Sequence, residues 1–460
     1  MSDILSTEKS ETSPPVNIKK VVAASMAGTI AEWYEFFIYG VSSTLVFGTL
    51  FFPKVDSPLT GIIAAFATYA IGFAARPLGG LIFGHYGDRL GRKKLLQFSL
   101  LLVGISTFLM GCIPSFATIG FWAPFTLIVL RFVQGFAVGG EWGGAVLLVS
   151  EHSPPEHRGF WASFPQSAAC AGNVLASIVL FTLSWLMDKN QFILWGWRIA
   201  FWGSAIIIFI GYYIRRSVED ADIFVEAQKE LSEQRKNSSS LKEVIVRYPK
   251  QLLLGTVVRI GENSVYYIII VFSITYLTLK VGIDYPSVLF IMFLANIFQF
   301  FAMLLGGYIS DRIGRKNCIL LGYIGLFVWL IFYFPFGLAS GNKLVILLFI
   351  CAGLGVQALC YGPQGALLSE IFPTRMRYSG ASFCYQIASI FAGSIAPMIA
   401  AILLAKYNAT VPITIYLFIV CGISTVALLC LHETRHLKLN TVDEKDRIKL
   451  GSRPIVEENY

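Results

Sequence analysis

The sequence has few charged residues for its length. Asp, Glu, Lys and Arg make up 14% of its 460 residues, hydrophobic residues make up 55%, and the mean hydropathy is +0.66. A water-soluble protein of this length needs more polar side chains to cover its surface. The composition therefore excludes an ordinary soluble protein. The net charge of +8 does not indicate a nucleic-acid partner either, because the basic residues lie mainly in loops on one side.

Motifs for metal, nucleotide or covalent chemistry are also lacking. The eight cysteines include no CxxC pair, and most, such as Cys112 and Cys170, lie in apolar runs, as small buried side chains do. His432 and His436 are four positions apart without a further obvious ligand, so we favour chance over a metal site. The phosphate-binding motif GxxxxGK[ST] is absent. We expect no metal, no bound cofactor and no enzymatic activity.

Long apolar runs are what the chain has in abundance. A run of about 20 apolar residues crosses about 30 Å of hydrocarbon as a helix, and a helix satisfies its own backbone hydrogen bonds in lipid. The pattern predicts an all-α integral membrane protein. Twelve such runs lie at about 21–52, 60–84, 95–114, 122–150, 160–187, 197–214, 251–280, 286–310, 318–338, 343–372, 380–406 and 411–431.

Polar segments divide the chain. Residues 1–20 are polar without a signal-peptide pattern, and residues 216–250 form the one long polar segment of the interior. Lys and Arg gather in the tails, the central segment and every second loop, so this side is predicted to be cytoplasmic. The predicted parts are an N-terminal tail (1–20), a six-helix bundle (21–215), a central cytoplasmic loop (216–250), a second six-helix bundle (251–431) and a C-terminal tail (432–460).

One charged motif occurs once in each half. Gly84–Lys94 reads GHYGDRLGRKK, and Gly307–Asn317 reads GYISDRIGRKN. Each copy lies between two apolar runs, so we expect a short charged loop between two helices in each of two related bundles. The residues that we expect to control opening of the cytoplasmic side are Gly84, Asp88, Arg89, Gly91 and Arg92 in the first copy and Asp311, Arg312, Gly314 and Arg315 in the second.

A second pair of segments repeats at a similar offset. LLVSEHSPPEHR at Leu147–Arg158 is similar to LLSEIFPTRMR at Leu367–Arg377, which places Glu151 at the position of Glu370. We expect the motif arginines to pair with these glutamates, and the motif aspartates to accept hydrogen bonds from a helix N-terminus or an arginine. Such a latch would hold the cytoplasmic side closed. The alternative is a plain positive anchor, which needs neither the aspartates nor the glycines.

The repeated motif GxxxDRxGRK and the six-plus-six division resemble the major facilitator superfamily. The resemblance covers nearly all of residues 20–431 and implies two six-helix bundles that transport a solute by alternating access. A narrower resemblance is to the metabolite:proton symporter family. It is based on Ala24-Ser25 with EWYEF at Glu32–Phe36, RPLGG at Arg76–Gly80, RFVQGFAVGGEWGGA at Arg131–Ala145 and WGWRIAF at Trp195–Phe201.

Membership of that family implies a proton as the coupling ion and a small metabolite as the solute. Its members carry shikimate, 2-oxoglutarate, citrate, proline or betaine, and its shikimate carriers look most similar to this chain. One departure concerns the first helix, because relatives usually have Asp at the position of Glu35 or Glu32. The longer carboxylates are expected to reshape the site or the substrate range.

Ionisable residues inside the membrane are candidates for function, because lipid makes them costly. Glu32 and Glu35 lie near the middle of the first helix on adjacent parts of one face. Two close carboxylates in a region of low dielectric constant repel, which favours protonation of one of them. A proton carrier needs this behaviour. The alternative is a structural pair in which each carboxylate is bonded to Tyr or Arg.

The fourth helix contributes Arg131 and Glu141, which are about 15 Å apart along its axis and cannot pair within a straight helix. The superfamily resemblance links the motif of Arg131 to proton coupling, and a substrate carboxylate would compete for the same guanidinium. Glu141 lies among glycines, where helices pack closely, so it serves either as a gate residue or as an anchor. Arg76, just before Pro77, would reach the cavity, a carboxylate or the cytoplasmic loop, and these alternatives stay open.

The seventh helix also contains an arginine and a glutamate, Arg259 and Glu262, which are one turn apart. Either the two neutralise each other, or Arg259 faces the cavity and binds an anionic substrate. Hydroxyl and amide side chains suit a polyhydroxylated acid, although they also serve helix packing. In total we assign proton coupling to Glu32, Glu35 and Arg131, and substrate binding to Tyr34, Gln134, Gln166, Arg259, Glu262 and Tyr266.

The expected function is proton-coupled import of a small organic acid, shikimate-like or another carboxylate. The alternative solute is a zwitterionic osmolyte such as proline or betaine. A channel or a receptor without transport is the rival class, and two gate-like motifs at equivalent positions favour alternating access over a channel. We expect a multi-pass protein of the cell inner membrane with both termini cytoplasmic. Its expected partners are the solute, protons and the lipid bilayer, and we expect a monomer.

Overall fold

A computed structural model describes residues 18–52, 58–90, 92–139, 142–219, 241–435 and 437. For residues 81–90, 92–97, 142–145 and a few others it describes the backbone alone. All regular structure in these ranges is helical, as the apolar runs predict. The predicted borders of the tails and of the central loop stay predictions, because residues 1–17, 220–240 and 438–460 lie outside the described ranges.

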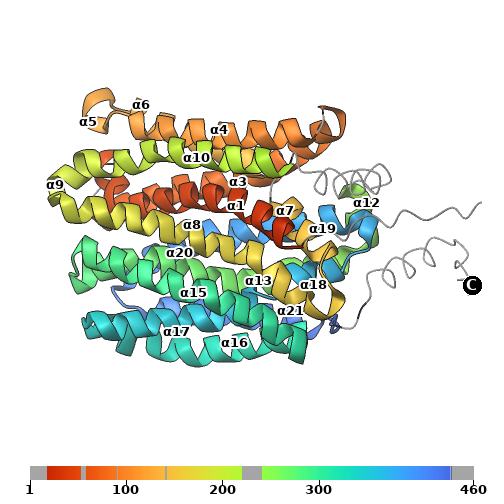
Figure 1. Ribbon diagram of the computed structural model, residues 1–460. Coiled ribbons are helices and arrows are strands. Elements are labelled where there is room, and N and C mark those ends of the chain that lie inside the picture. Colours follow the sequence, from red (N-terminus) through yellow and green to blue (C-terminus); the bar gives the residue numbers. More distant parts are fainter. Residues whose placement is uncertain are drawn as a thin grey trace, which may run out of the picture.

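The helices run side by side along one direction (Figure 1). The first half contains α1, η1 and α2 (Ile18–Ser42, Ser43–Phe47, Gly48–Leu50), α3 (Pro58–Leu90), α4 (Arg92–Cys112), α5 (Phe116–Ile119), α6 (Trp122–Val138), α7 (Trp142–Glu151), η2 (Pro155–His157), α8 (Arg158–Leu186), and α9, η3 and α10 (Lys189–Gln191, Phe192–Gly196, Trp197–Glu219).

The second half follows α12 (Leu241–Arg247). It contains α13, η4, α14 and η5 (Pro249–Tyr267, Ile268–Phe272, Ser273–Tyr276, Leu277–Val281), α15 (Tyr285–Ile313), α16, η6 and η7 (Arg315–Phe332, Tyr333–Gly337, Leu338–Ser340), α17 (Lys343–Tyr361), α18 (Gln364–Glu370), α19, η8 and α20 (Thr374–Ser389, Ile390–Ile395, Ala396–Tyr407) and α21 (Val411–Leu429).

Large apolar side chains cover the outside of this helix array. Phe209, Trp185 and Phe301 are 71%, 70% and 65% exposed. Such a surface is unfavourable in water and favourable in lipid. By length and composition, nine helices in the described part of the chain are able to cross a membrane. The molecule is therefore a multi-pass membrane protein.

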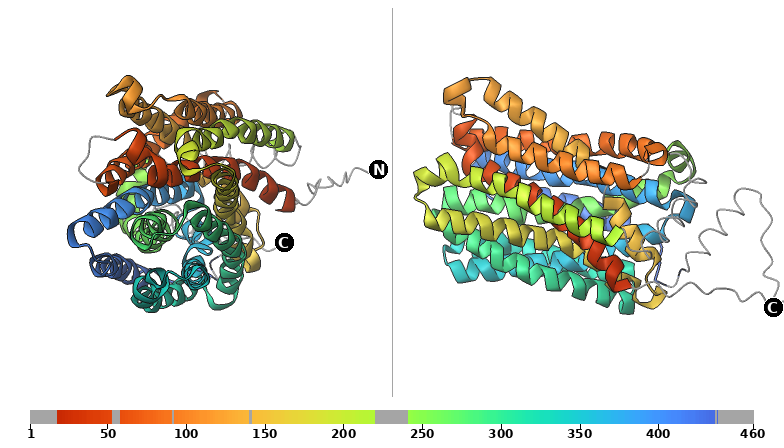
Figure 2. Two further views of the ribbon diagram at one scale, coloured as in Figure 1. Left: turned by 90° about the vertical axis from the view of Figure 1, so that its left-hand side faces the viewer. Right: turned by 45° about the horizontal axis from the view of Figure 1, so that its top comes forward.

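The two halves lie next to each other, with the earlier helices in one group and the later helices in the other (Figure 2). The most extensive contacts between them are those of α8 with α15 and of α3 with η8 and α20, and α7 also contacts α18 and α19. In the first pair, Asn173 Nδ2 donates to Asn296 Oδ1 at 2.9 Å, and both side chains are buried. An amide pair of this kind fixes the register of the two helices inside an apolar interface.

Within the first half, α3 and α6 approach each other closely enough to touch through their backbones. A Cβ atom on Gly135 would overlap the carbonyl oxygen of Gly72, and one on Gly139 would overlap the carbonyl oxygen of Arg76. Small residues allow this approach between membrane helices. The glycines of the fourth membrane segment therefore serve packing inside the molecule, as the sequence predicts, at least at these two positions.

The predicted short charged loop between α15 and α16 is wrong in extent. α15 continues through Asp311 and Arg312 to Ile313, and α16 begins at Arg315, so a single residue separates the two helices. That residue, Gly314, has φ +101°, a conformation that side chains disfavour and glycine adopts easily. The charged residues of the motif are therefore rigid parts of helix ends. A further difference is a turn at Gly362 and Pro363, which splits the predicted run 343–372 into α17 and α18.

Candidate functional site

Glu35 lies in the interior of the first half and is bonded to neutral groups. The Thr107 hydroxyl of α4 donates to Glu35 Oε2 at 2.5 Å and accepts from Gln134 Nε2 of α6 at 2.6 Å. Gln134 Oε1 in turn accepts from Nη1 of Arg131. The other carboxylate oxygen, Oε1, is buried without a hydrogen-bond partner. A chain of two neutral side chains therefore connects the carboxylate to the guanidinium.

Arg131 is buried among aromatic rings. Its Cζ lies 4.1 Å from the ring centre of Tyr39, 4.2 Å from that of Phe36 and 4.7 Å from that of Tyr69. The ring faces favour a cation electrostatically. Nε and Nη2 of Arg131 have no hydrogen-bond partner. The guanidinium is therefore held in place while part of its hydrogen-bonding capacity stays unused.

The second half contains a comparable carboxylate with closer partners. Glu262 accepts from Gln357 Nε2 at 2.5 Å and from Gln364 Nε2 at 3.1 Å, and it lies 3.7 Å from Nη1 of Arg259. Arg259 also donates to Gln364 Oε1 at 3.0 Å. The helices α13, α17 and α18 supply this network. The predicted possibility that Arg259 and Glu262 neutralise each other is consistent with the 3.7 Å pair, but Nε of Arg259 has no partner.

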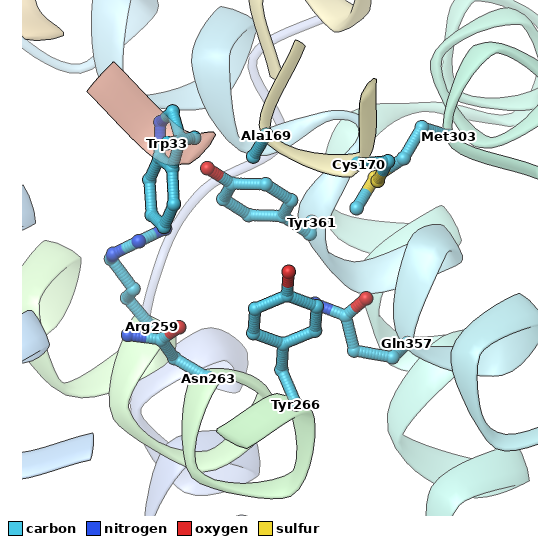
Figure 3. A pocket seen from close by; sticks show the side chains of 9 residues that line it. All are labelled: Trp33, Ala169, Cys170, Arg259, Asn263, Tyr266, Met303, Gln357 and Tyr361. Carbon is cyan, nitrogen blue, oxygen red and sulfur yellow. The ribbon is translucent and has the colours of Figure 1, made fainter. Parts of the chain in front are cut away.

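A cavity lies between the halves and is lined by residues of both (Figure 3). Its volume is about 10 Å³, which is room for about one water molecule, so a solute fits only after the halves move apart. Three buried polar atoms of its lining have no partner, namely Nε of Arg259, Nδ2 of Asn263 and the Tyr266 hydroxyl. The lining consists of Trp33, Ala169, Cys170, Arg259, Asn263, Tyr266, Met303, Gln357 and Tyr361.

The other predicted binding residues lie in different places. Tyr34 donates to the carbonyl oxygen of Ala200 in α10 at 2.9 Å, which directs its hydroxyl toward another helix of its own half. Gln134 belongs to the hydrogen-bond chain of Glu35. Gln166 and Glu32 are buried. Glu32 lies within electrostatic range of Tyr385 in α19, so the two glutamates of α1 have different neighbours. Glu141 lies outside the described residues.

Charged side chains join the halves at the end where the charged motifs lie. Arg158 at the start of α8 donates to Glu370 Oε1 at 3.2 Å, and Arg377 in α19 donates to Glu151 Oε1 at 2.8 Å. Arg158 also donates to the carbonyl oxygen of Ser150, and Arg377 to that of Ser369. Each arginine therefore crosses to the glutamate of the other half. We call this set of two arginines and two glutamates the reciprocal latch.

Asp311 adds a second contact at the same end. Its two oxygens accept from the backbone N–H groups of Gly159 and Phe160, both at 2.8 Å, where α8 begins. Helix N-termini favour negative charge because their first N–H groups are unpaired. Arg315 pairs with Asp311 at 2.6 Å and with Glu370 at 3.3 Å. The predicted hydrogen bonds of Asp311 and the predicted pairing of Arg315 with Glu370 are therefore present.

The chain after α21 returns to this end of the molecule. Glu433 accepts from the backbone N–H groups of Arg315 and Lys316 at 2.8 and 3.0 Å, where α16 begins. The Thr434 hydroxyl donates to Glu370 Oε2 at 2.6 Å. The carboxylate of Glu370 is thus bonded from several directions and fixed in position.

For several other residues that were predicted to control the gate, no contact between the halves is described. Arg312 contacts Tyr308 of its own helix, through a hydrogen bond and the ring face. The backbones of Gly84, Asp88, Arg89 and Arg92 lie in α3 and α4, but their side chains, and all of Gly91, lie outside the described residues. Their roles stay predictions.

The sequence interpretation did not assign a site role to Arg158 or Arg377. The available signal was their position in the repeat, because both lie seven residues after the paired glutamates Glu151 and Glu370. Thr107, Gln357 and Gln364 were also missed. For these three no sequence signal exists, because their role depends on which helix faces meet.

Comparison with known proteins identifies the family. The sequence profile of the Major Facilitator Superfamily matches residues 23–393. The inner membrane metabolite transport protein YhjE of Escherichia coli K12 is 39% identical over 430 residues, which cover 92% of this chain and 97% of that protein. The shikimate transporter of the same organism is 35% identical over 421 residues (91% and 95%), and its proline/betaine transporter is 33% identical over 432 residues (92% and 85%).

Solved structures agree in fold. The proton:xylose symporter XylE bound to 6-bromo-6-deoxy-D-glucose aligns with a TM-score of 0.70 and 17% identity over 93% of this chain and 98% of that chain. The inward open form of XylE from E. coli aligns with a TM-score of 0.67 and 18% identity, over 93% and 99%. The helix array and the matched profile define a multi-pass membrane transporter. The chain belongs to the Major Facilitator Superfamily, which confirms the predicted resemblance and fold class.

Proposed function

We propose that the protein carries a small organic acid across the cell inner membrane together with protons. The observation that supports this most is the position of Glu35, whose carboxylate is fully buried, bonded to Thr107 and connected through Gln134 to Arg131. A buried carboxylate without a direct ion pair takes up a proton readily, and a nearby cation favours its release. Movement of Arg131 relative to Glu35 would therefore switch proton binding.

Alternating access is supported by the cavity and the reciprocal latch. The cavity lies between the halves, so a relative movement of the halves would open it to one side at a time. The reciprocal latch joins the halves at one end, which we propose to be the cytoplasmic end, with both chain termini on that side. Release of the latch would then open the cavity to the cytoplasm.

The unpaired donors of the cavity support an acid as the solute. Nε of Arg259, Nδ2 of Asn263 and the Tyr266 hydroxyl can all donate to carboxylate or hydroxyl oxygens of a ligand. A hydroxylated carboxylate such as shikimate presents both types of group, and one relative is named as a shikimate transporter. We therefore propose shikimate or a related carboxylate first.

A zwitterionic osmolyte is the second candidate. The cavity is lined by the rings of Trp33, Tyr266 and Tyr361, and aromatic faces bind quaternary ammonium groups. Relatives at 33% identity are named as proline/betaine transporters. Betaine would place its ammonium group against these rings and its carboxylate toward an arginine beside the cavity.

Uptake into proteoliposomes with an imposed inward proton gradient tests the proposal. The labelled solutes are shikimate, 2-oxoglutarate, citrate, proline and betaine, each with and without an uncoupler. We expect accumulation of one acid that the uncoupler abolishes. Accumulation of betaine or proline alone would favour the second candidate. Accumulation that the uncoupler does not affect would contradict proton coupling.

A further inference from the structure

Arg76 of α3 is a buried cation to which the proposed mechanism assigns no role. It is 2% exposed. A Cβ atom on Gly139 would overlap the carbonyl oxygen of Arg76, and a Cβ atom on Gly79 would overlap the carbonyl oxygen of Phe136. The backbone of α3 around Arg76 therefore packs directly against α6 and against Gly139, which follows α6. The guanidinium cannot leave the interior unless these helices separate.

Aromatic rings surround the guanidinium of Arg76. Its Cζ lies 4.2 Å from the ring centre of Phe36, 4.8 Å from that of Phe73 and 5.9 Å from that of Trp33. Ring faces contact the plane of a guanidinium and leave its N–H edges available. The same Phe36 ring also lies 4.2 Å from Cζ of Arg131, so two cations share one ring and repel each other.

The edge of Arg76 that is formed by Nε and Nη2 has no partner. Both atoms are buried without a hydrogen bond. Among the described residues no carboxylate forms an ion pair with Arg76, whereas Arg158, Arg315 and Arg377 at the latch each have one. Nε–H and one N–H of Nη2 point in the same direction, and together they bind the two oxygens of a carboxylate.

Arg76 also lies next to the cavity. The Trp33 ring contacts Arg76 and lines the cavity in which Arg259 lies. Tyr267 and Tyr385 have both Arg76 and Arg259 as electrostatic neighbours. Two arginines, one from each half, therefore approach the same group of aromatic side chains. A cation that has no ion-pair partner among the described residues is costly at this depth, and a ligand anion would supply the missing charge.

We propose that Arg76 binds the carboxylate of the transported solute through its Nε and Nη2 edge. The inference rests on the proposed transport of a carboxylate-bearing solute and adds the residue that recognises it. It applies to every candidate, because shikimate, 2-oxoglutarate, citrate, proline and betaine all carry a carboxylate. Arg259 then recognises a different part of the solute or a second carboxylate from the other half.

Binding to the purified full-length protein in detergent tests this role without a proton gradient. Titration calorimetry with the five solutes identifies one that binds, and its methyl ester, which lacks the carboxylate charge, serves as the matched probe. We expect Arg76→Gln to weaken binding of the acid about 30-fold or more and to leave binding of the ester within a few-fold of the unsubstituted protein. Lys406→Gln is the control, because Lys406 is an exposed cation that contacts Tyr407.

Arg76→Lys keeps the charge but loses the planar edge, and it provides a second variant if Arg76→Gln does not fold. We expect it to weaken acid binding by roughly tenfold, less than Arg76→Gln does. Equal affinity of the acid for the unsubstituted protein and for either variant would overturn the inference. Equal loss of acid and ester binding would also overturn it, because a merely structural role affects both. Failure of all five solutes to bind the unsubstituted protein would count against it too.

The outcomes separate this inference from the proposed function. Loss of acid binding in Arg76→Gln, together with a lack of proton-driven uptake by the unsubstituted protein, would contradict proton coupling and support the role of Arg76. Proton-driven uptake that Arg76→Gln retains in full would support the proposed function and contradict the role of Arg76.

Discussion

At the scale of single residues, Glu35 differs from Glu262 in how its charge is balanced. Glu262 has a guanidinium 3.7 Å away, whereas Glu35 reaches Arg131 only through Thr107 and Gln134. A direct partner stabilises the ionised form, and neutral partners do so less. Glu35 is therefore the better candidate for a group that binds and releases a proton in each cycle.

We predict that Glu35→Gln abolishes proton-driven accumulation and leaves solute exchange. The amide keeps the size of the side chain and the hydrogen bond with Thr107 but cannot take up a proton. Uptake and counterflow in proteoliposomes measure the two activities. Glu35→Asp is the matched control, because it keeps the carboxylate, and it should retain accumulation. Full accumulation by Glu35→Gln would remove Glu35 from the mechanism.

The sequence predicted the identity of these ionisable residues but not their neighbours. Glu35 and Arg131 were recognisable because charged residues are rare in apolar runs. Tyr34 was expected to contact the solute, yet its hydroxyl reaches Ala200 in another helix. Spacing along one helix determines which residues share a face, but the rotation of each helix against its neighbours depends on packing across the whole array. Thr107 was not predicted for the same reason.

At the scale of helices, the crossing of α3 and α6 depends on glycine. We predict that Gly135→Ala prevents stable folding, because the added Cβ would overlap the carbonyl oxygen of Gly72. The yield of monodisperse protein in detergent and its thermal unfolding measure this effect. The matched control is Gly422→Ala in α21, where no atom lies within 4 Å of the added Cβ. Equal stability of the two variants would show that the helices adjust more easily than this packing implies.

The start of α15 depends on the N-cap residue Asp284, which lies outside the membrane-spanning helices. Partial burial disfavours its ionised form, but hydrogen bonds from Ser287 and Lys343 outweigh this effect and lower the pKa of its carboxyl. A lowered pKa means that the ionised cap stabilises the folded state above the usual pKa of Asp. This stabilisation is lost as the pH falls through the lowered pKa.

We predict that Asp284→Ala lowers the free energy of unfolding by about 1 kcal/mol at neutral pH. The difference should shrink as the pH falls through the lowered pKa of the carboxyl. Thermal unfolding at several pH values measures it. Asp284→Asn is the control, since asparagine also caps a helix, and it should cost less. A difference that does not depend on pH would contradict the role of the ionised carboxyl.

The charged motifs show what a repeat predicts about helices and what it does not. The repeat correctly indicated that Arg315 would reach Glu370 and that Asp311 would meet a helix N-terminus. It was interpreted as a loop because each copy lies between two apolar runs. Only Gly314 separates the two helices, and Glu433 accepts from the first N–H groups of α16.

At the scale of the whole molecule, we propose that the reciprocal latch controls which side is open. We predict that Glu151→Gln shifts the protein toward the cytoplasm-open state, because it removes the charge that Arg377 binds at 2.8 Å. A hydrogen bond to a charged group contributes about 1.5–3 kcal/mol. Cys170 lines the cavity, so its rate of alkylation from the cytoplasmic side reports the opening.

The control for this prediction is Glu156→Gln, which changes an exposed glutamate near the latch. It should leave the alkylation rate unchanged. Arg377→Gln should act like Glu151→Gln, and the double variant should add little to either, because both remove the same pair. Weaker solute binding at an unchanged alkylation rate would contradict the role of the latch.

The crossed pattern of the latch also concerns the origin of the molecule. Each half contains one arginine and one glutamate at equivalent positions, and each of them pairs with its opposite in the other half. Two identical copies of one half, related by a twofold axis, would form the same two ion pairs without any change of sequence. The contact is self-complementary, so a symmetric dimer of one such half would already form it.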